Sequence, residues 1–246
     1  MAQNVSEDYK SIISSLNHWF ETKVSIGGTE VGENLLMSVY TKNQLFDTDQ
    51  PSVGCAVSGE ITVTLIDNGL EIPRMAEIRP YVRVTDGTDT SEWIPQGVFY
   101  VDTRFVTHND NGLDILTLTG YDVMLKAEQA YPYDTQEIAS TVVKNICGLM
   151  GLTWSTDVDS HVWEIIPVNG GDTIQCSGEY TAREHLQYIA ALYGANWTIT
   201  NEGKLNLVRL NDIPPETSLL TDESGYTLNF GDPQDDDTPD AERIVV

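Results

Sequence analysis

Successive segments rich in β-branched and aromatic residues fill the first half of this 246-residue chain, and they constrain its fold more than any other feature. The segments read VSIGGTEV, LMSVYTK, GEITVTLI, RPYVRVTD and GVFYVDTRFVT, and LDILTLTGY follows after a loop at residues 108–112. Partial alternation of apolar and polar residues is typical of strands, and the Gly, Asn and Asp residues between them favour tight turns. Residues 24–122 are therefore predicted to form an antiparallel β-barrel or sandwich, with a hairpin across the loop.

Three other segments have the three- and four-residue spacing of amphipathic helices. The first is predicted to begin after Ser6 and to present Ile12, Ile13, Leu16, Trp19 and Phe20. The second has Asp134 and Glu137 at capping-box spacing, the stripe Ile138, Val142, Ile146 and Leu149, and Gly148 and Gly151 as stops. The third has Thr181 and Glu184 as capping box, the stripe Leu186, Ile189, Ala190 and Tyr193, and Gly194 as stop.

A glycine and then a tryptophan follow each of the last two predicted helices, in GLTWST from Gly151 and in GANWTIT from Gly194. This pattern predicts a helix followed by a Trp-bearing strand twice, although it is too weak to define a repeat. The second strand is expected to form a hairpin with KLNLVRL through a turn at residues 201–203.

The predicted fold class is therefore α+β and mainly antiparallel β: a β-barrel or sandwich domain followed by an α+β domain with two capped helices. The predicted parts are an N-terminal helix or arm at residues 1–22, a barrel domain at 23–130, an α+β domain at 131–231, and an acidic linker with a terminal strand at 232–246. The composition of DPQDDDTPDAE is that of a solvated linker, and ERIVV resembles the start of a strand, which either pairs back onto the fold or marks a chain cut from a longer parent.

The chain is strongly acidic, with 38 Asp and Glu against 13 Lys and Arg and a net charge of −25. Such a surface disfavours tight binding of nucleic acid and of anionic membranes, because both need clustered basic residues. The nearest approach to a basic cluster is Arg74, Arg79, Arg83 and Arg104. No secretion signal or membrane-spanning segment is expected.

Three cysteines, Cys55, Cys147 and Cys176, lie far apart and without a CxxC pair. This spacing predicts buried, free thiols rather than a metal or redox site.

Catalytic residues are not predicted. The histidines are His18 in the first helix, His108 in a hairpin loop, His161 in a polar loop and His185 on the last helix, and no GxSxG pattern accompanies them. The least unfavourable metal ligands are Asp157, Asp159 and the run Asp235, Asp236 and Asp237, but no second cluster supports them. No phosphate-binding loop is present in the sequence, and no cofactor is expected.

Two binding or catalytic alternatives stay open. The rings of Trp93, Trp154, Trp163 and Trp197 could stack on sugars in a carbohydrate-binding module, whereas core packing is the favoured interpretation of these side chains. A cell-wall hydrolase using a pair of acids has only the abundance of acids in its favour.

Two segments resemble the hub or tail-tip proteins of phages and prophages from Gram-positive bacteria and of related contractile injection systems. In EWIPQGVFYVDTRFV and DILTLTGYDVMLKAEQAY, the matching positions run from Gly97 to Asp102 and from Leu116 to Asp122. In TAREHLQYIAALYGANWTITNEGKLNLVRL, they are Thr181, Arg183, Leu186, Ile189, Ala190, Gly194, Gly203 and Leu205. The matches cover roughly residues 92–210, and their order and spacing agree with the family.

This resemblance implies a structural virion protein, without enzymatic activity, that forms a ring, usually a trimer. The ring would connect the tail tube to the tip or spike and let DNA pass. Its implied partners are a tail tube or distal tail protein, a tape measure protein, and a spike or fibre. The implied location is the tail tip of the virion, after synthesis in the host bacterial cytoplasm. An acidic lumen would suit this role, because it would not bind the phosphates of passing DNA.

Overall fold

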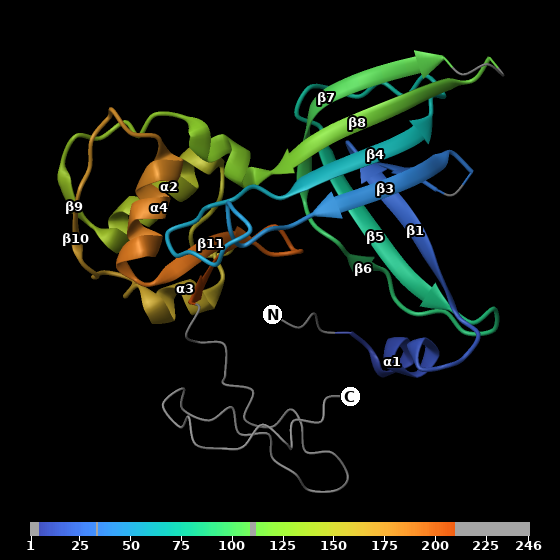
Figure 1. Cartoon of the computed structure of the whole chain (residues 1–246), viewed down its shortest axis with the longest axis horizontal. Helices are drawn as coiled ribbons and strands as arrows, with labels where there is room; N and C mark the ends of the chain where they lie inside the picture. Colours follow the sequence, from blue (N-terminus) through green and yellow to red (C-terminus); the bar gives the residue numbers. More distant parts are fainter. Residues whose placement is uncertain (1–4, 33, 109–111, 210–246) are drawn as a thin grey trace, which may run out of the picture. The chain divides into compact units, whose positions relative to one another are not determined.

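The computed structural model describes residues 5–32, 34–108 and 112–209, and an antiparallel sheet dominates the first half of this part. The sheet contains β1 (Trp19–Ile26), β2 (Thr29–Val31), β3 (Leu36–Lys42), β4 (Glu60–Ile66), β5 (Glu77–Thr85), β6 (Ile94–Pro95), β7 (Phe99–His108) and β8 (Asp114–Asp122). The strand order is β2-β1-β5-β7-β8-β4-β3, and β6 pairs with β5 (Figure 1). The α+β class and the antiparallel pairing are confirmed.

Alternation of side chains along these strands builds the first hydrophobic core. In β4, Ile61, Val63 and Leu65 are fully buried, whereas the residues between them are half-buried. The predicted hairpin is confirmed, because β7 pairs with β8 from Phe99–Asp122 to His108–Asp114. The period-two pattern therefore predicts both the strands and the face that each one buries.

The predicted barrel is not closed among the described residues. β2 and β3 end the strand order, and the pairing of β5 with β7 is limited to Glu77–Tyr100 and Ile78–Phe99. A pocket of about 240 Å³ is lined by Thr22 of β1 and by residues 36–39 of β3, and these two strands do not pair with each other in the described part of the chain. The sheet is open, and two strand edges border the gap.

The N-terminal helix is shorter than predicted. α1 (Glu7–Ile13) begins as expected after Ser6, whose Oγ accepts a hydrogen bond from the Tyr9 N–H. Trp19 and Phe20 belong instead to β1, where they pair with Thr85 and Val84. The apolar spacing fits both structures, and the long-range partner β5 decides in favour of the strand.

Short strands and helices form the second half of the described chain. They are η1 (Val123–Glu128), β9 (Gln136–Ile138), α2 (Ala139–Met150), α3 (Ser160–Ile165), β10 (Thr173–Gln175), α4 (Ala182–Leu192), β11 (Ala195–Ile199) and β12 (Leu205–Arg209). β9 pairs with β10, and β11 forms the predicted hairpin with β12. A second hydrophobic core, which includes the fully buried Trp197 and Tyr131, joins α2, α3, α4 and this hairpin.

The third predicted helix is confirmed in detail, but the second begins later than predicted. Thr181 and Glu184 form the capping box of α4. Asp134 and Glu137 do not form one: Glu137 lies in β9, and α2 begins after Ile138 without a side-chain cap. The left-handed Gly151 ends α2, whereas Gly148 lies inside it.

Two other expectations for this half are wrong. No strand contains Trp154, which lies in a turn, so the helix–glycine–tryptophan strand occurs once, at Trp197. His161 lies in α3 rather than in a polar loop.

The boundary between the two cores falls near residue 122. Val123, Met124 and Ala127 of η1 pack in the second core, and Ala56, from the loop before β4, also joins it. The four-part division made from the sequence stays a prediction. The acidic segment and the terminal strand predicted at 232–246 lie outside the described residues.

Candidate assembly surface

Asp122, the last matching position of the first motif-bearing segment, lies where the sheet meets the second core. Its carboxylate is buried and accepts hydrogen bonds from the N–H groups of Gly59 at 2.6 Å and Met124 at 2.9 Å. The second bond caps η1. Burial raises the pKa of Asp122 to about 6, and the two N–H donors and the Arg183 charge oppose this increase.

Arg183, from the second motif-bearing segment, ties α4 to the same place. Its Nη2 donates to Ser58 Oγ at 2.8 Å and to the Met124 carbonyl at 2.9 Å, and its Nη1 pairs with Glu128 at 2.9 Å. The two segments therefore meet through Met124, which contacts both Asp122 and Arg183. The roles of Asp122 and Arg183 here are to hold the sheet, η1 and α4 together.

Gly120 and Asp102, also positions of the motifs, shape the β7–β8 hairpin. A Cβ on Gly120 would lie 2.5 Å from the Tyr100 carbonyl oxygen of the neighbouring strand, so no larger residue fits without a shift of the backbone. Asp102 is the extra residue in the register shift between Val101 and Thr103, which is a β-bulge. Before this bulge β7 contributes the buried Phe99 and Val101, and after it residues 102–108 are all exposed.

Strands β7, β8, β4 and β3 lie next to one another in this order, and the two outer strands of this group, β7 and β3, have unpaired edges in the described part of the chain. β3 pairs with β4 alone, and residues 103–108 of β7 pair with β8 alone (Figure 1). Both edges expose large apolar side chains: Met37 and Tyr40 on β3, and Phe105, 66% exposed, on β7. We call these two edges, residues 36–42 and 103–108, the assembly edges, because exposed, unpaired strands with apolar side chains are suited to pairing with another chain.

The four histidines are each held by nearby groups. The Nδ1 atoms of His18 and His185 contact the carbonyls of Ser15 at 2.8 Å and Thr181 at 2.9 Å. His108, the last residue of β7, pairs with Asp114, and His161 pairs with Glu164 in α3. The structure therefore explains each imidazole by a local contact that orients it.

The two described candidate metal ligands are also held by nearby groups. Asp157 accepts from the Thr153 N–H and the Thr156 hydroxyl, and Asp159 caps α3 through the His161 N–H. No cluster of three or more His, Cys, Asp or Glu side chains suited to a metal occurs in residues 5–32, 34–108 and 112–209. Asp235, Asp236 and Asp237 lie outside these ranges.

The three cysteines are buried and free, as predicted. Burial raises the pKa of Cys147 to about 12, so this thiol stays protonated at neutral pH.

The tryptophans considered for sugar binding contact other protein groups. Trp197 is fully buried and its Nε1 donates to the Leu186 carbonyl at 2.7 Å. The Trp93 ring lies beneath Lys23 and Arg83, and Trp154 packs edge-to-face with Trp163. The Lys144 ammonium lies over the rings of both Trp154 and Trp163.

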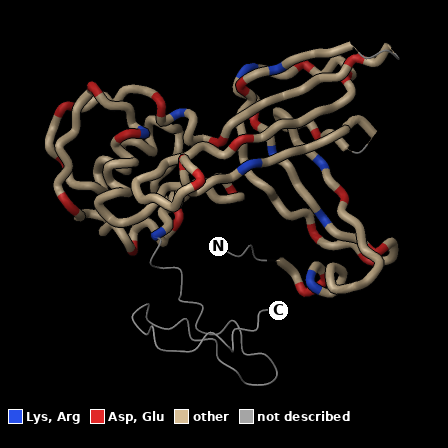
Figure 2. The backbone as a smooth tube through the Cα atoms, in the orientation of Figure 1, with Lys and Arg blue, Asp and Glu red and all other residues tan. Residues whose placement is uncertain are grey.

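Acidic residues are spread over both the strands and the helices, and basic residues are few (Figure 2). Arg79 and Arg83, two members of the weak basic cluster, pair with Glu77 and Glu21. Within the described residues, no helix is long and apolar enough to span a membrane.

Comparison with known proteins identifies the fold. No family model and no curated protein sequence matches the chain. Among solved structures, the 43 kDa tail protein of prophage MuSo2 from Shewanella oneidensis is similar over 78% of this chain and 56% of that one, with 16% identity and a TM-score of 0.53. The tail protein from Neisseria meningitidis MC58 is similar over 76% of this chain and 50% of that one, with 12% identity and a TM-score of 0.48. A third structure, the lidded Francisella PdpA–VgrG complex, has 9% identity and a TM-score of 0.44 over 85% of this chain and 31% of that one.

The first of these similarities shows that the chain shares the fold of the MuSo2 tail protein. The chain spans about half the length of the two tail proteins it matches.

The sequence identified the motif residues but not their contacts. Asp122 and Arg183 were positions of a resemblance, and no local pattern indicated that they meet at Met124. The assembly edges were also missed, because the sequence predicted a hairpin partner for one side of the stretch after Asp102 and does not show that its other side is unpaired.

Proposed function

We propose that this chain is a structural subunit of a phage tail, a hub or tail-tip protein that forms a ring between the tail tube and the tip or spike. The observation that carries the proposal is the fold shared with the MuSo2 43 kDa tail protein. The two motif-bearing segments support it, because their residues form the junction that holds the sheet to the second core. The Gram-positive host that these motifs imply is part of the proposal.

The assembly edges support the ring. They lie on opposite sides of the four strands β7, β8, β4 and β3 of the sheet, so the edge at β3 of one copy can pair with the edge at β7 of the next. Such a head-to-tail contact uses two different surfaces and closes into a ring when the rotation between copies permits. The family resemblance implies three copies.

The charge of the chain supports a passage for DNA. A net charge of −25 keeps phosphates from binding to the wall of a conduit. In this proposal the chain has no enzymatic activity, its partners are the tube or distal tail protein, the tape measure and the spike or fibre, and its location is the tail tip.

Light scattering and particle analysis test the proposal. We expect the purified chain to form a closed oligomer, with three copies as the expected number, and antibodies against it to label the tail tip of particles in electron micrographs. Tyr40→Lys on β3 and Phe105→Lys on β7 should each reduce the oligomer, because a charge at the centre of an edge opposes strand pairing.

Tyr188→Lys is the matched control, because Tyr188 is 61% exposed, as Tyr40 is at 60%, but lies on α4 away from the assembly edges. This variant should keep the wild-type oligomer. A wild-type chain that is monomeric at all concentrations and absent from tails would refute the proposal, and so would equal effects of all three substitutions.

A further inference from the structure

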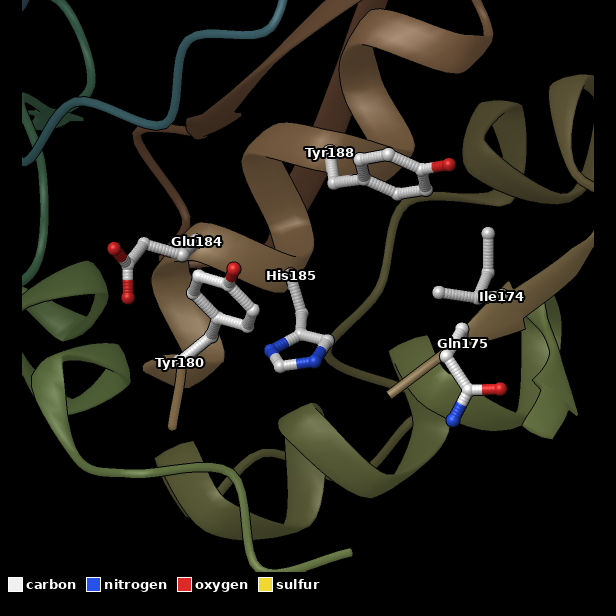
Figure 3. Close-up of a pocket in the computed structure, with 6 residues that line it drawn as sticks. All are labelled: Ile174, Gln175, Tyr180, Glu184, His185 and Tyr188. Carbon is white, nitrogen blue, oxygen red and sulfur yellow. The ribbon is translucent and has the colours of Figure 1, made fainter. Parts of the chain in front are cut away.

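A groove runs between strand β10 and helix α4, on the second half of the chain and away from the assembly edges. It holds a pocket of about 410 Å³ (Figure 3). The pocket is lined by Ile174 and Gln175 of β10, by Tyr180, and by Glu184, His185 and Tyr188 of α4. This volume is sufficient for one large side chain of a bound molecule.

One wall of the groove is a strand with an unpaired edge. The Ala139 N–H donates to the Asp172 carbonyl, and the Cys176 N–H donates to the Thr135 carbonyl, both at 2.9 Å. Hydrogen-bonded positions alternate in an antiparallel ladder, so residues 172, 174 and 176 face β9. The N–H and C=O groups of Thr173 and Gln175 therefore point away from β9, and β10 pairs with no other strand in the described part.

The aromatic residues give the groove its second property. Tyr180 and Tyr188 are 55% and 61% exposed, although both are large and partly apolar. Between them lies His185, which is buried and forms the floor (Figure 3). Its Nδ1–H donates to the Thr181 carbonyl and its Nε2 accepts from the Ser177 N–H, so the ring is held as the neutral tautomer.

The only charge in the lining is negative. It belongs to Glu184, whose Oε2 accepts from the Thr181 N–H at 2.7 Å and from the Thr181 hydroxyl at 3.0 Å. These bonds lower the pKa of Glu184, so the carboxylate stays ionised. The pocket thus combines aromatic faces, an apolar residue and a carboxylate. Its lining contains no lysine or arginine.

This combination matches a long basic side chain. The methylene groups of arginine pack on apolar surface, and its guanidinium stacks on aromatic rings and pairs with carboxylates. The overall charge of the chain also favours a basic ligand, and a sugar or nucleic acid would not use the strand edge.

We propose that this groove binds an extended, basic segment of a partner protein, which adds as a strand to the open edge of β10 and places an arginine against Tyr180 and Tyr188. Strand addition supplies main-chain hydrogen bonds to Thr173 and Gln175, and the pocket supplies selectivity for the side chain. The binding mode is independent of ring formation and of the proposed role in a tail.

NMR titration of the full chain with capped peptides tests this inference. The peptides are Thr-Val-Arg-Val-Thr and the matched forms with Glu or Leu at the centre. We expect the Arg peptide to shift the amide signals of Thr173, Gln175 and Tyr188 and to bind about tenfold more tightly than the Glu peptide. Equal or tighter binding of the Glu or Leu peptide would overturn the proposal, and so would the absence of shifts at these residues. A parallel titration with the sugar chitotetraose tests carbohydrate binding, and shifts caused by this sugar alone would also overturn the proposal.

Two proline variants separate strand addition from other binding modes. Gln175→Pro removes an N–H that points away from β9, so it spares the β9–β10 ladder while taking one donor from the incoming strand. It should weaken the Arg peptide about fivefold, the effect of one hydrogen bond. Gln136→Pro makes the same change on the outer edge of β9 and should leave binding unchanged, and an equal loss in both variants would refute strand addition.

Two side-chain variants test the pocket itself. Tyr188→Ala changes an exposed residue and should weaken the Arg peptide about fivefold, while Tyr40→Ala, at a similarly exposed residue on β3, should not. Glu184→Gln keeps the capping box and removes the charge, so it should reduce the preference for Arg over Leu. An unchanged preference would show that the pocket does not select a basic side chain.

Discussion

Replacement of Arg183 by alanine tests the junction between the sheet and the second core. The substitution removes two hydrogen bonds from a charged donor, to Ser58 Oγ and to the Met124 carbonyl, each worth about 1.5–3 kcal/mol. The ion pair with Glu128 adds little, at most about 1 kcal/mol, because the Glu128 side chain is 54% exposed. We expect the free energy of unfolding to fall by about 4 kcal/mol, measured by urea denaturation.

Three further variants divide this loss among the contacts. Arg183→Lys keeps the charge but replaces the planar fork with one ammonium group, so it should cost about 2 kcal/mol. Glu128→Gln should cost less than about 1 kcal/mol, and Ser58→Ala about 1 kcal/mol. A loss below about 1 kcal/mol for Arg183→Ala would refute the role of Arg183, since a buried carbonyl without its donor should cost more than that. A Glu128→Gln loss as large as that of Arg183→Ala would assign the stability to the ion pair instead.

Three other substitutions probe the same region and the second core. The pKa of Asp122 is raised from 3.8 to about 6 in the folded state, so its stabilising contribution is fully present below pH 3.8 and is lost as the pH rises through about 6. The stability difference between wild type and Asp122→Asn should therefore fall by about 2 kcal/mol between about pH 4 and pH 7. Urea denaturation at these two pH values measures this change, and equal differences at both would contradict it. Gly120→Ala should lower stability by about 1–3 kcal/mol, because its Cβ meets the Tyr100 carbonyl, and an unchanged melting temperature would argue against the close strand approach. Trp197→Phe should cost about 1–3 kcal/mol in chemical denaturation, because it removes the indole hydrogen bond to the Leu186 carbonyl at a fully buried position, whereas a neutral effect would show that the bond is dispensable.

Local signals predicted the elements whose contacts are close in sequence. The capping box of Thr181 and Glu184 needs residues three apart, and the hairpins β7–β8 and β11–β12 need partners joined by one short turn. The sequence contains all the information for such structures within a few residues.

Signals of the same kind failed where a distant partner competes. Asp134 and Glu137 have capping-box spacing, but residues 136–138 pair with β10, which lies more than 30 residues further along the chain. Trp19 and Phe20 fit a helical stripe, but they pair with β5. The open sheet was missed for the same reason, since closure depends on whether β1 reaches β3, and no local pattern reports this.

The candidate surfaces depend still more on tertiary structure. The pocket combines a strand and a helix whose residues are separated by a loop, and its exposed Tyr188 belongs to a helix face that the sequence pattern leaves ambiguous. The assembly edges exist because particular neighbours are missing, and a sequence pattern does not show which strand lies at an edge.

The bulge at Asp102 also bears on how such a chain can evolve. Residues 103–108 follow it and are all exposed, so substitutions there leave both hydrophobic cores unchanged. The segment can therefore vary in sequence at little cost in stability, while Gly120, Asp122 and Arg183 cannot. Related chains should diverge fastest in this half of β7, which lets one scaffold acquire new neighbours while its fold is conserved.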